Sequence, residues 1–556
     1  MSAHSRALLA AALQLLSERG FRQIRYAPGG ARIFRGPLQL STVPLTVNLL
    51  IWDWDFLEYP CVRVMASDTA RFPELRPHLN EDGDVCYFSR RSVVLDRYDP
   101  ATAIAQCLDQ ATAVLDKILN DHHYLATDVQ NELLVHWERQ RPQAVSAWLG
   151  SVKHGAIQAP LHFATNDGGV ILADDYKAAA TIASALHLGS IKATSNRCWL
   201  FHVSTLPPVP PHFPQNVREL FDWLREWDHR LYKAVQRLLG TDDAYAFVYL
   251  GLAVHTPVGW IGLLFNPNLG GKAPASKMKA VLHERGEMIR VERLAFTDVS
   301  PEFVHTRNLL FRDLSGLTIT LVGCGAIGSQ LAAALIRLGA GQGSNGILRL
   351  VDEEDLKAEN LGRHYLGYDR LGQNKASALR SELLAQFPLS RTEAVPYSAQ
   401  HDRMLFRGDL LIDATGDEPV SEYLNAQWLE QSRPCPVLYC WIKGNGECVQ
   451  ALFVDGPQDA CFRCLRESSQ DVYRQERFPV LKQPPMRKVL GCHAFTPYAV
   501  TAPLQAAALA ADILCDWAKG DVSPRYRTRA RENVDIHPTA NLDPQPLADC
   551  PACTLL

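Results

Sequence analysis

A glycine-rich turn lies within Thr318-Ile-Thr-Leu-Val-Gly-Cys-Gly-Ala-Ile-Gly328, directly after a short run of apolar residues. The apolar run predicts a buried strand, and the residues after it predict the start of a helix. Gly323, Gly325 and Gly328 stand where a strand turns tightly, a phosphate approaches backbone amides and a helix packs closely. The pattern predicts a nucleotide-binding site. A purely structural turn or an NAD site would have the same sequence.

From Leu317 onward, strands alternate with helices. The expected strands are 317–323, 347–352 and 409–414, and the expected helices are 327–338 and 375–387. Such alternation is typical of a parallel, doubly wound sheet. We therefore expect an α/β Rossmann-like domain in the C-terminal part of the chain.

Charged residues that follow the turn favour ATP over a dinucleotide. Asp352 ends the second strand, at about the 20-residue distance from which an acidic side chain accepts hydrogen bonds from a ribose. Arg363 and Lys375 supply cations for a triphosphate, and the carboxylate of Asp417 can hold the Mg²⁺ that bridges its oxygens. A hydride-transfer site has little need for such charge. Each residue alone is more simply a solvated surface charge, so the hypothesis rests on their order and spacing.

The stretch 317–417 closely resembles the adenylation domain shared by ubiquitin-activating enzymes and bacterial sulfur-carrier adenylyltransferases of the ThiF/MoeB type. This resemblance implies ATP rather than NAD, with Asp352 at the ribose and Asp417 positioning Mg²⁺. The residues that it places around the phosphates are Asn360, Arg363 and Lys375. Arg307 resembles the family's N-terminal arginine, which reaches ATP across a dimer interface, and so implies a homodimer. The nearby Arg312 is the alternative for that position.

Two Cys-x-x-Cys pairs predict a metal site near the C-terminus. They are Cys461-Phe-Arg-Cys464 and Cys550-Pro-Ala-Cys553. Four thiolates in two pairs are the ligand set of a closed, tetrahedral Zn²⁺ site. Similar pairs occur in the adenylation family, which supports structural zinc. Reduced unpaired thiols or a redox disulfide are the alternative.

A further cysteine, Cys492, lies between the two pairs. It follows Gly491 in an expected loop before an alanine-rich helix over 501–517, where a helix N-terminus or His493 favours a thiolate. In ubiquitin-activating enzymes the nucleophilic cysteine occupies this place in the order. The resemblance implies that Cys492 is the nucleophile, and a buried structural cysteine is the alternative.

The N-terminal third predicts an α+β domain. A first helix ends near Gly20, an antiparallel meander covers 31–65, an irregular segment covers 71–91, and a second helix covers about 101–119. The irregular segment contains Arg76-Pro77-His78-Leu79-Asn80-Glu-Asp-Gly83-Asp-Val-Cys86, which resembles the active-site segment of ubiquitin-conjugating enzymes. The resemblance implies that Cys86 is catalytic. His78 stands where that family has an asparagine, so His78 or the displaced Asn80 must replace it.

Composition excludes several classes of function. Lys and Arg total 56, and Asp and Glu total 60, so the net charge is -4. The chain as a whole therefore has no positive field that would attract nucleic acid or an anionic membrane. The 14 cysteines are too sparse for a secreted disulfide scaffold, which favours a reducing, cytoplasmic compartment. The apolar stretch 498–518 is interrupted by polar and acidic residues, so we expect no membrane span.

These patterns divide the chain into three expected domains: a conjugating-like domain at 1–140, a central α/β linker domain at 141–300, and an adenylation domain at 301–556. The linker, with a strand-like run at 244–252, carries no recognisable chemistry. The combination resembles the fused enzymes of bacterial ubiquitin-like systems, notably those of CBASS antiphage operons.

The resemblance implies ATP-dependent activation of a protein C-terminus, a thioester on Cys492, transfer to Cys86 and ligation to a target amine. The implied carried protein is a cGAS/DncV-like nucleotidyltransferase. Two alternatives stay open at this point. One is a sulfur-carrier adenylyltransferase of cofactor biosynthesis, and the other is a nucleotide-sensing scaffold without enzymatic activity.

Overall fold

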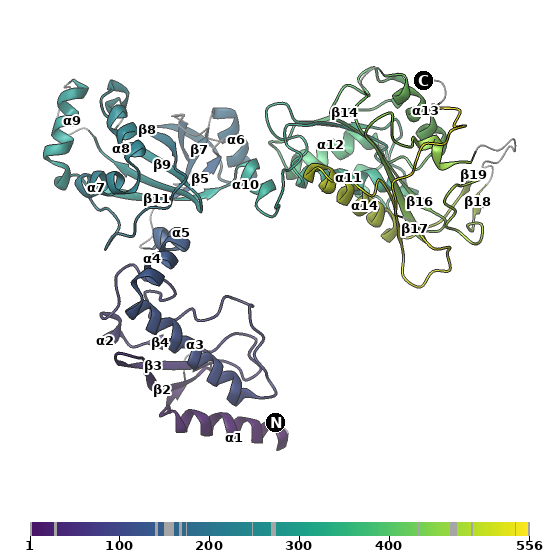
Figure 1. Ribbon diagram of the computed structural model, residues 1–556. Helices are drawn as coiled ribbons and strands as arrows, with labels where there is room; N and C mark the ends of the chain where they lie inside the picture. The colour runs from purple at the N-terminus through teal and green to yellow at the C-terminus, as the bar shows by residue number, and fades with distance from the viewer. Residues whose placement is uncertain are drawn as a thin grey trace. The chain divides into compact units, whose positions relative to one another are not determined.

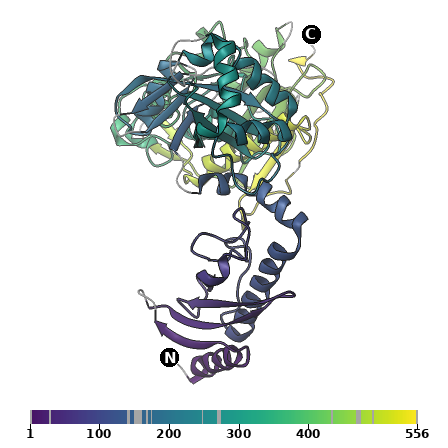
Figure 2. The same cartoon turned by 90° about the vertical axis from the view of Figure 1, so that its left-hand side faces the viewer.

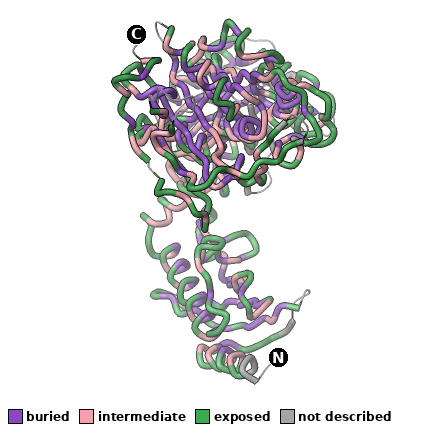
Figure 3. Tube along the Cα trace, turned by 90° about the vertical axis from the view of Figure 1, so that its right-hand side faces the viewer, coloured by how far each residue is buried: buried purple, intermediate pink, exposed green. Residues whose placement is uncertain are grey.

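The computed structural model describes residues 3–26, 30–139, 143–148, 161–165, 169–173, 175–246, 248–267, 274–431, 434–467, 475–490, 493–539 and 541–553 (Figure 1). The chain divides into two compact units. The first comprises Met1–Ala179 with Leu188–Asp298, and the second comprises Ala180–His187 with Val299–Leu556. Buried residues follow the strands and the inner faces of the helices, whereas many connecting segments are exposed (Figure 3).

The first unit begins with a four-stranded sheet. The elements of this region are α1 (Ala3–Glu18), β1 (Arg22–Tyr26), β2 (Arg32–Gln39), β3 (Pro44–Ile51), β4 (Cys61–Val64), α2 (Ala66–Thr69), α3 (Pro100–Asn120), α4 (His122–Asn131) and α5 (Leu133–Glu138). The sheet order is β1-β2-β3-β4, and every pair is antiparallel, which confirms the predicted meander. Buried and exposed residues largely alternate along β2, as expected where one face of a sheet covers a core.

Helix α3 packs on this sheet beside α1 (Figure 2). The side chain of Asp99 caps α3 by accepting a hydrogen bond from the backbone N–H of Thr102 at 3.1 Å, and Pro100 occupies the first position. Its apolar residues recur every three or four positions and are buried. Residues 71–91, between the sheet and α3, form turns, bends and isolated bridges, which confirms the predicted irregular segment.

A closed barrel follows in the middle of the chain. Its strands are β5 (Gln143–Trp148), β6 (Leu161–Thr165), β7 (Val170–Ala173), β8 (Ile191–His202), β9 (Leu250–Thr256), β10 (Gly259–Phe265) and β11 (Val291–Asp298), and the helices are α6 (Tyr176–Ala185), α7 (Val217–Trp227), α8 (His229–Leu238) and α9 (Ala275–Glu284). The order around the barrel is β10-β11-β5-β7-β6-β8-β9, with parallel and antiparallel pairs mixed. This agrees with the expected mixed α/β content.

The strand that the run at 244–252 predicted begins later in the structure. A 3₁₀ turn, η1 (Asp242–Tyr245), occupies its beginning, and β9 starts only at Leu250. The apolar residues Val248 and Tyr249 are 48% and 39% exposed, so their hydrophobicity does not indicate a buried strand here. Two acidic residues in the first turn favour the helical conformation, because negative charge near the N-terminus of a helix interacts favourably with its dipole.

Helix α5 is anchored to the barrel by Trp137. Its indole Nε1–H donates a hydrogen bond to the carbonyl oxygen of Leu294 at 2.9 Å. Its ring stacks with Trp223, at 6.1 Å between centroids, and Leu75 belongs to the same buried cluster. The loop before Cys86 and the barrel therefore share one core.

The second unit contains a seven-stranded sheet. Its elements are α10 (Pro301–Thr306), β12 (Thr318–Val322), α11 (Ala326–Arg337), β13 (Ile347–Val351), α12 (Lys375–Gln386), β14 (Thr392–Val395), β15 (Leu410–Asp413), α13 (Glu418–Leu429), β16 (Val437–Lys443), β17 (Cys448–Val454), β18 (Lys488–Leu490), β19 (His493–Phe495), α14 (Thr501–Lys519) and β20 (Tyr526–Ala530). The order is β14-β13-β12-β15-β16-β17-β20. The predicted strands are confirmed as parallel neighbours, and two antiparallel strands, β17 and β20, extend the sheet.

Helices cover both faces of this sheet. One buried cluster joins α11, α12 and α14 to β12, and a second joins α13 to the other face. Along β15, Leu410 and Ile412 belong to the first cluster and Leu411 to the second, because successive side chains of a strand point to opposite faces. The predicted doubly wound arrangement is confirmed. None of the described helices, α14 included, has the length and hydropathy needed to cross a membrane.

Candidate active site

The turn between β12 and α11 leaves no room for side chains at two of its three glycines. Gly323 has φ +84°, and a Cβ there would lie 2.9 Å from the backbone nitrogen of Thr415. A Cβ on Gly328 would lie 1.7 Å from the carbonyl oxygen of Gly323. A Cβ on Gly325 would meet no atom within 4 Å. The first and third glycines serve packing, whereas Gly325 leaves open space at the N-terminus of α11, where a phosphate can approach.

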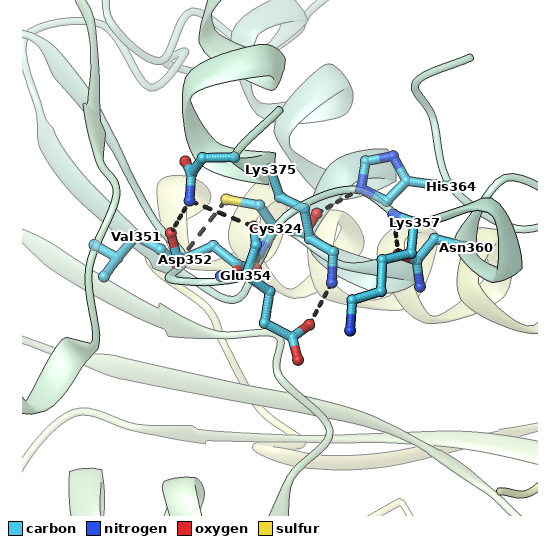
Figure 4. A network of polar contacts seen from close by, with 9 residues as sticks. Cys324, Val351, Asp352, Glu354, Lys357, Asn360, His364 and Lys375 are labelled. Atoms are coloured by element: carbon cyan, nitrogen blue, oxygen red, sulfur yellow. Dashed lines mark hydrogen bonds and ion pairs between the residues drawn. The ribbon is translucent and has the colours of Figure 1, made fainter. Parts of the chain in front are cut away.

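Asp352 ties the end of β13 to this turn (Figure 4). Its Oδ2 accepts a hydrogen bond from the backbone N–H of Cys324 at 2.7 Å, and its Oδ1 accepts one from the N–H of Glu354 at 2.8 Å. Burial raises the pKa of this carboxyl group. The acidic residue that the sequence identified is therefore fixed in position beside the glycine turn.

Lys375 is almost fully buried at the start of α12, with 4% of its surface exposed. Its ammonium group forms an ion pair with the carboxylate of Glu354, which extends toward it (Figure 4). This hydrogen bond lowers the pKa of Glu354. The sequence identified Lys375 but not its partner, because Glu354 belongs to an acidic run in which no residue stands out.

A buried histidine that the sequence did not indicate joins the next segment to the turn. His364 Nε2 lies 2.7 Å from the carbonyl oxygen of Cys324, and its Nδ1 accepts a hydrogen bond from the N–H of Leu366 at 3.0 Å. Burial lowers the pKa of His364, which favours a neutral ring protonated at Nε2. The backbone carbonyl of Asn360 accepts a hydrogen bond from the N–H of His364 at 3.0 Å.

The other predicted nucleotide residues have these surroundings. Asn360 Oδ1 accepts a hydrogen bond from the N–H of Lys357 at 3.0 Å. The guanidinium of Arg363 lies 5.2 Å from the ring centroid of Tyr498, which precedes α14. Arg307 is exposed just after α10, with its guanidinium 6.0 Å from the ring of Phe303.

Two aspartates lie near the end of β15. Asp417 is exposed and caps α13, because its Oδ1 accepts a hydrogen bond from the N–H of Val420 at 3.4 Å. The sequence did not single out Asp413, which is buried and accepts a hydrogen bond from the hydroxyl of Thr415 at 2.6 Å. Burial raises the pKa of Asp413. Only Asp417 is open enough to contact a hydrated metal ion.

The four cysteines of the predicted metal site come together. Their sulfur atoms all lie within 4.8 Å of one another, and the set is Cys461, Cys464, Cys550 and Cys553. The hydrogen bond with Cys461 lowers the pKa of Cys464 to about 5, and the N–H of Leu547 donates to the same sulfur at 3.4 Å. A cluster of this composition and spacing could hold a metal ion.

Cys86 is exposed in the irregular segment of the first unit. Its backbone N–H donates a hydrogen bond to the carbonyl oxygen of His78 at 2.7 Å. Gly83 has φ +84°, and a Cβ there would lie 2.6 Å from the carbonyl oxygen of Val64, so this turn requires glycine. The backbone therefore holds the cysteine next to His78.

Two carboxylates of α4 and its C-terminus hold the ring of His78. Its Nε2 lies 3.1 Å from Asp128 Oδ2, and its Nδ1 lies 3.0 Å from Glu132 Oε1. Both nitrogens must carry hydrogen to donate to carboxylates, so this geometry favours the imidazolium. Hydrogen bonds with Cys86 and Glu132 raise the pKa of His78 to about 10. Asn80, the alternative, uses its Oδ1 to accept a hydrogen bond from the N–H of Asp84 at 2.7 Å.

The sequence did not reveal Asp128 and Glu132, because they lie on a different element from His78 and match no motif. The remaining predicted nucleophile, Cys492, lies outside the described residues. Two short strands, β18 and β19, flank it and pair antiparallel.

The chain matches two family models. The ThiF family matches residues 299–551, and the prokaryotic E2 family B matches residues 24–145. An ATP-dependent ubiquitin transferase-like protein, Cap2, from Pseudomonas aeruginosa is 27% identical over 99% of both chains. The Vibrio cholerae protein of the same name is 24% identical over 84% of both chains. Among solved structures, E. coli MccB with ATP matches 43% of this chain and 66% of its own, with 15% identity and a TM-score of 0.32.

The chain is a fused E1-like and E2-like enzyme. Its ThiF region contains the glycine turn, Asp352 and Lys375, and its E2 region contains Cys86 and His78. The glycine turn, Asp352 and Lys375 therefore lie in one compact unit of the chain, and the exposed Cys86 lies in the other.

We expect alanine substitutions at two glycines of this turn to have different effects. Gly328→Ala should destabilise the second unit by roughly 3 kcal/mol or more, because the methyl group would overlap a backbone oxygen. Gly325→Ala should leave the melting temperature unchanged but weaken ATP binding, because its methyl group occupies the open space. Thermal unfolding and calorimetric titration with ATP measure both. Wild-type ATP affinity in Gly325→Ala would contradict phosphate approach at this turn.

The raised pKa of His78 predicts a pH dependence of stability. Its stabilising effect is complete below the unfolded-state value of 6.5 and is lost as the pH rises toward about 10. The difference in free energy of unfolding between wild type and His78→Gln should therefore shrink between pH 6.5 and 10. Urea unfolding at constant ionic strength measures it, with the exposed His122→Gln as the matched control. A constant difference across this range would show that His78 is not held as an imidazolium.

Proposed function

We propose that the enzyme activates the C-terminal carboxylate of a protein and transfers it through two cysteines to an amine. The carboxylate attacks the α-phosphorus of ATP, and pyrophosphate leaves. The thiolate of Cys492 attacks the resulting acyl adenylate and releases AMP. The thiolate of Cys86 then displaces that of Cys492. An amine, expected to be a lysine, attacks the second thioester, loses a proton and forms an amide as the Cys86 thiolate leaves.

One observation carries this proposal: a single chain matches a ThiF model and an E2 model over separate residues. Two relatives that match most of the chain are called ATP-dependent ubiquitin transferase-like proteins, which supports the same chemistry. The domains that we propose are a conjugating-like domain at 1–140, a linker at 141–300 and an adenylation domain at 301–556.

In the adenylation step, we assign Asp352 to the ribose of ATP. We assign the phosphates to Asn360, Arg363 and Lys375 together with the open turn at Gly325. Mg²⁺, positioned by Asp417, would neutralise charge on the phosphate oxygens. The exposure of Arg307 supports a role at the ATP of a second subunit, and hence a homodimer.

In the transfer step, we assign His78 to the position of the usual asparagine. Its imidazolium beside Cys86 would stabilise the negative charge that develops on the thioester carbonyl oxygen during attack. Asp128 and Glu132 would keep the ring protonated and oriented. Asn80 is the alternative, and its Oδ1 accepts a hydrogen bond from the N–H of Asp84.

The protein that is carried must present a C-terminus long enough to reach the adenylation site and Cys86. By the CBASS likeness we propose a cGAS/DncV-like nucleotidyltransferase, joined to amines of target proteins in the cytoplasm during antiphage defence. A sulfur-carrier adenylyltransferase is the less supported alternative, because it leaves the E2 match at 24–145 without a catalytic role.

The relay predicts different results for two cysteine variants. With ATP, Mg²⁺ and the candidate carried protein, wild type should form thiol-labile adducts on non-reducing gels. Cys492→Ala should form none, because the first acceptor is missing. Cys86→Ala should keep the first adduct and lose the amide product. Cys515→Ala, a half-buried cysteine on α14, is the matched control. Amide product from Cys86→Ala would exclude the relay.

We also propose that the four-cysteine cluster holds a structural Zn²⁺. Its sulfur spacing and the hydrogen bond from the N–H of Leu547 to Cys464 support a closed site with an oriented ligand. Zinc would bind the thiolates and fix the C-terminal segment against η6 (Phe462–Leu465).

Loss of zinc should therefore lower the stability of the second unit. Cys553→Ser should reduce the zinc content, measured by mass spectrometry, from about one ion per chain toward zero, and lower the melting temperature. Cys515→Ser should change neither. An unchanged melting curve after verified metal removal would contradict a structural role.

A further inference from the structure

A polar cavity lies in the first unit, next to the loop that carries His78. Its volume is about 760 Å³, which falls within the range of small-molecule sites. The walls come from the 74–81 loop, the end of α5, residues 213–215 and the start of β11. None of the roles assigned above uses this cavity.

Four arginines line the cavity: Arg76, Arg139, Arg290 and Arg293. Arg139 donates to the carbonyl oxygens of Leu79 and Arg76, at 3.2 and 3.5 Å, and Arg293 donates to that of Arg139 at 2.8 Å. Within the described residues, no ion pair includes Arg76, Arg139 or Arg290. Three carboxylates also line the cavity, on Glu74, Glu81 and Glu292, and all three residues are exposed.

Arg76, Arg139 and Arg293 are half-buried, Arg290 is exposed, and the nearby carboxylates offset only part of the cost of burying these cations. Desolvation lowers the pKa of Arg76, Arg139 and Arg293, and the charge of Arg76 lowers that of Arg139 further. The Nε of Arg76 is buried and has no hydrogen-bond partner among the described residues. A bound anion would relieve both the repulsion and the missing hydrogen bonds.

His136 supplies an independent indication of a ligand. This residue lines the cavity, is fully buried, and has no hydrogen-bond partner at either ring nitrogen among the described residues. Its Nε2 lies 3.8 Å from Glu132 Oε2, which is beyond hydrogen-bonding distance. Buried polar groups are rarely left unpaired, so an occupant of the cavity is the expected partner.

We propose that this cavity binds the phosphate groups of an oligophosphate ligand between Arg76, Arg139 and Arg290. Each guanidinium group can donate paired hydrogen bonds to phosphate oxygens, and an oligophosphate offers oxygens to several arginines at once. A single carboxylate would leave most of these donors unpaired. The ligand is either a nucleotide or free pyrophosphate, and both share this chemistry.

The site is coupled to the cysteine loop. Arg139 holds the carbonyl groups on either side of His78, and Glu132 lies between the rings of His78 and His136. A ligand that bridges Arg76 and Arg139 therefore steadies the backbone that positions Cys86. This inference does not depend on the relay.

The test is calorimetric titration of the full chain with inorganic pyrophosphate in the absence of Mg²⁺. Binding should weaken at least tenfold in Arg76→Ala and in Arg290→Ala, and should stay unchanged in Arg285→Ala, an exposed arginine outside the cavity. Lys375→Ala impairs the adenylation site and should keep this binding. Absence of binding in Lys375→Ala, or wild-type affinity in both cavity variants, would overturn the proposal.

Two further measurements complete the test. In Lys375→Ala, ATP that binds more tightly than pyrophosphate would identify a nucleotide, whereas adenosine binding as tightly as ATP would refute phosphate recognition. If the variants do not fold, hydrogen exchange on wild type decides. Pyrophosphate should slow exchange at 73–80 and 290–293, and binding without such protection would place the ligand elsewhere.

Discussion

The close approach of α11 to the turn after β12 is the constraint on which the nucleotide region depends. Because Gly328 packs against the carbonyl of Gly323, the helix begins directly at the turn, and the space beside Gly325 at its N-terminus is open. The N–H of Cys324 then reaches Asp352, and the carbonyl of Cys324 reaches His364. One short turn thus fixes the ends of two strands and the segment that carries Asn360.

Tight backbone turns also fix the loop that carries Cys86 in the first unit. Gly83 and His78 both adopt positive φ, and tertiary contacts hold them there. In the nucleotide region a buried lysine meets one carboxylate, and in the cysteine loop a histidine meets two. In both regions, carboxylates therefore fix the position of a basic side chain.

Residues at fixed spacing could be predicted from the sequence. The glycine turn, the parallel strands and the two cysteine pairs each have a local pattern, and the structure brings their members together. Residues such as His364, Glu354, Asp128 and Glu132 could not be predicted, because tertiary packing alone brings them to their partners. The strand predicted at 244–252 was wrong at its beginning for a related reason, because hydrophobicity does not reveal which side chains the fold leaves exposed.

The sulfur cluster joins parts of the chain that are 89 residues apart in sequence, at Cys461 and Cys550. The intervening segment, which carries Cys492 and α14, is therefore a closed loop rather than a free tail. Its two ends cannot separate while the sulfur atoms stay together, so the number of conformations open to the loop is reduced. A protease that cut this loop once would leave both fragments attached to the same fold.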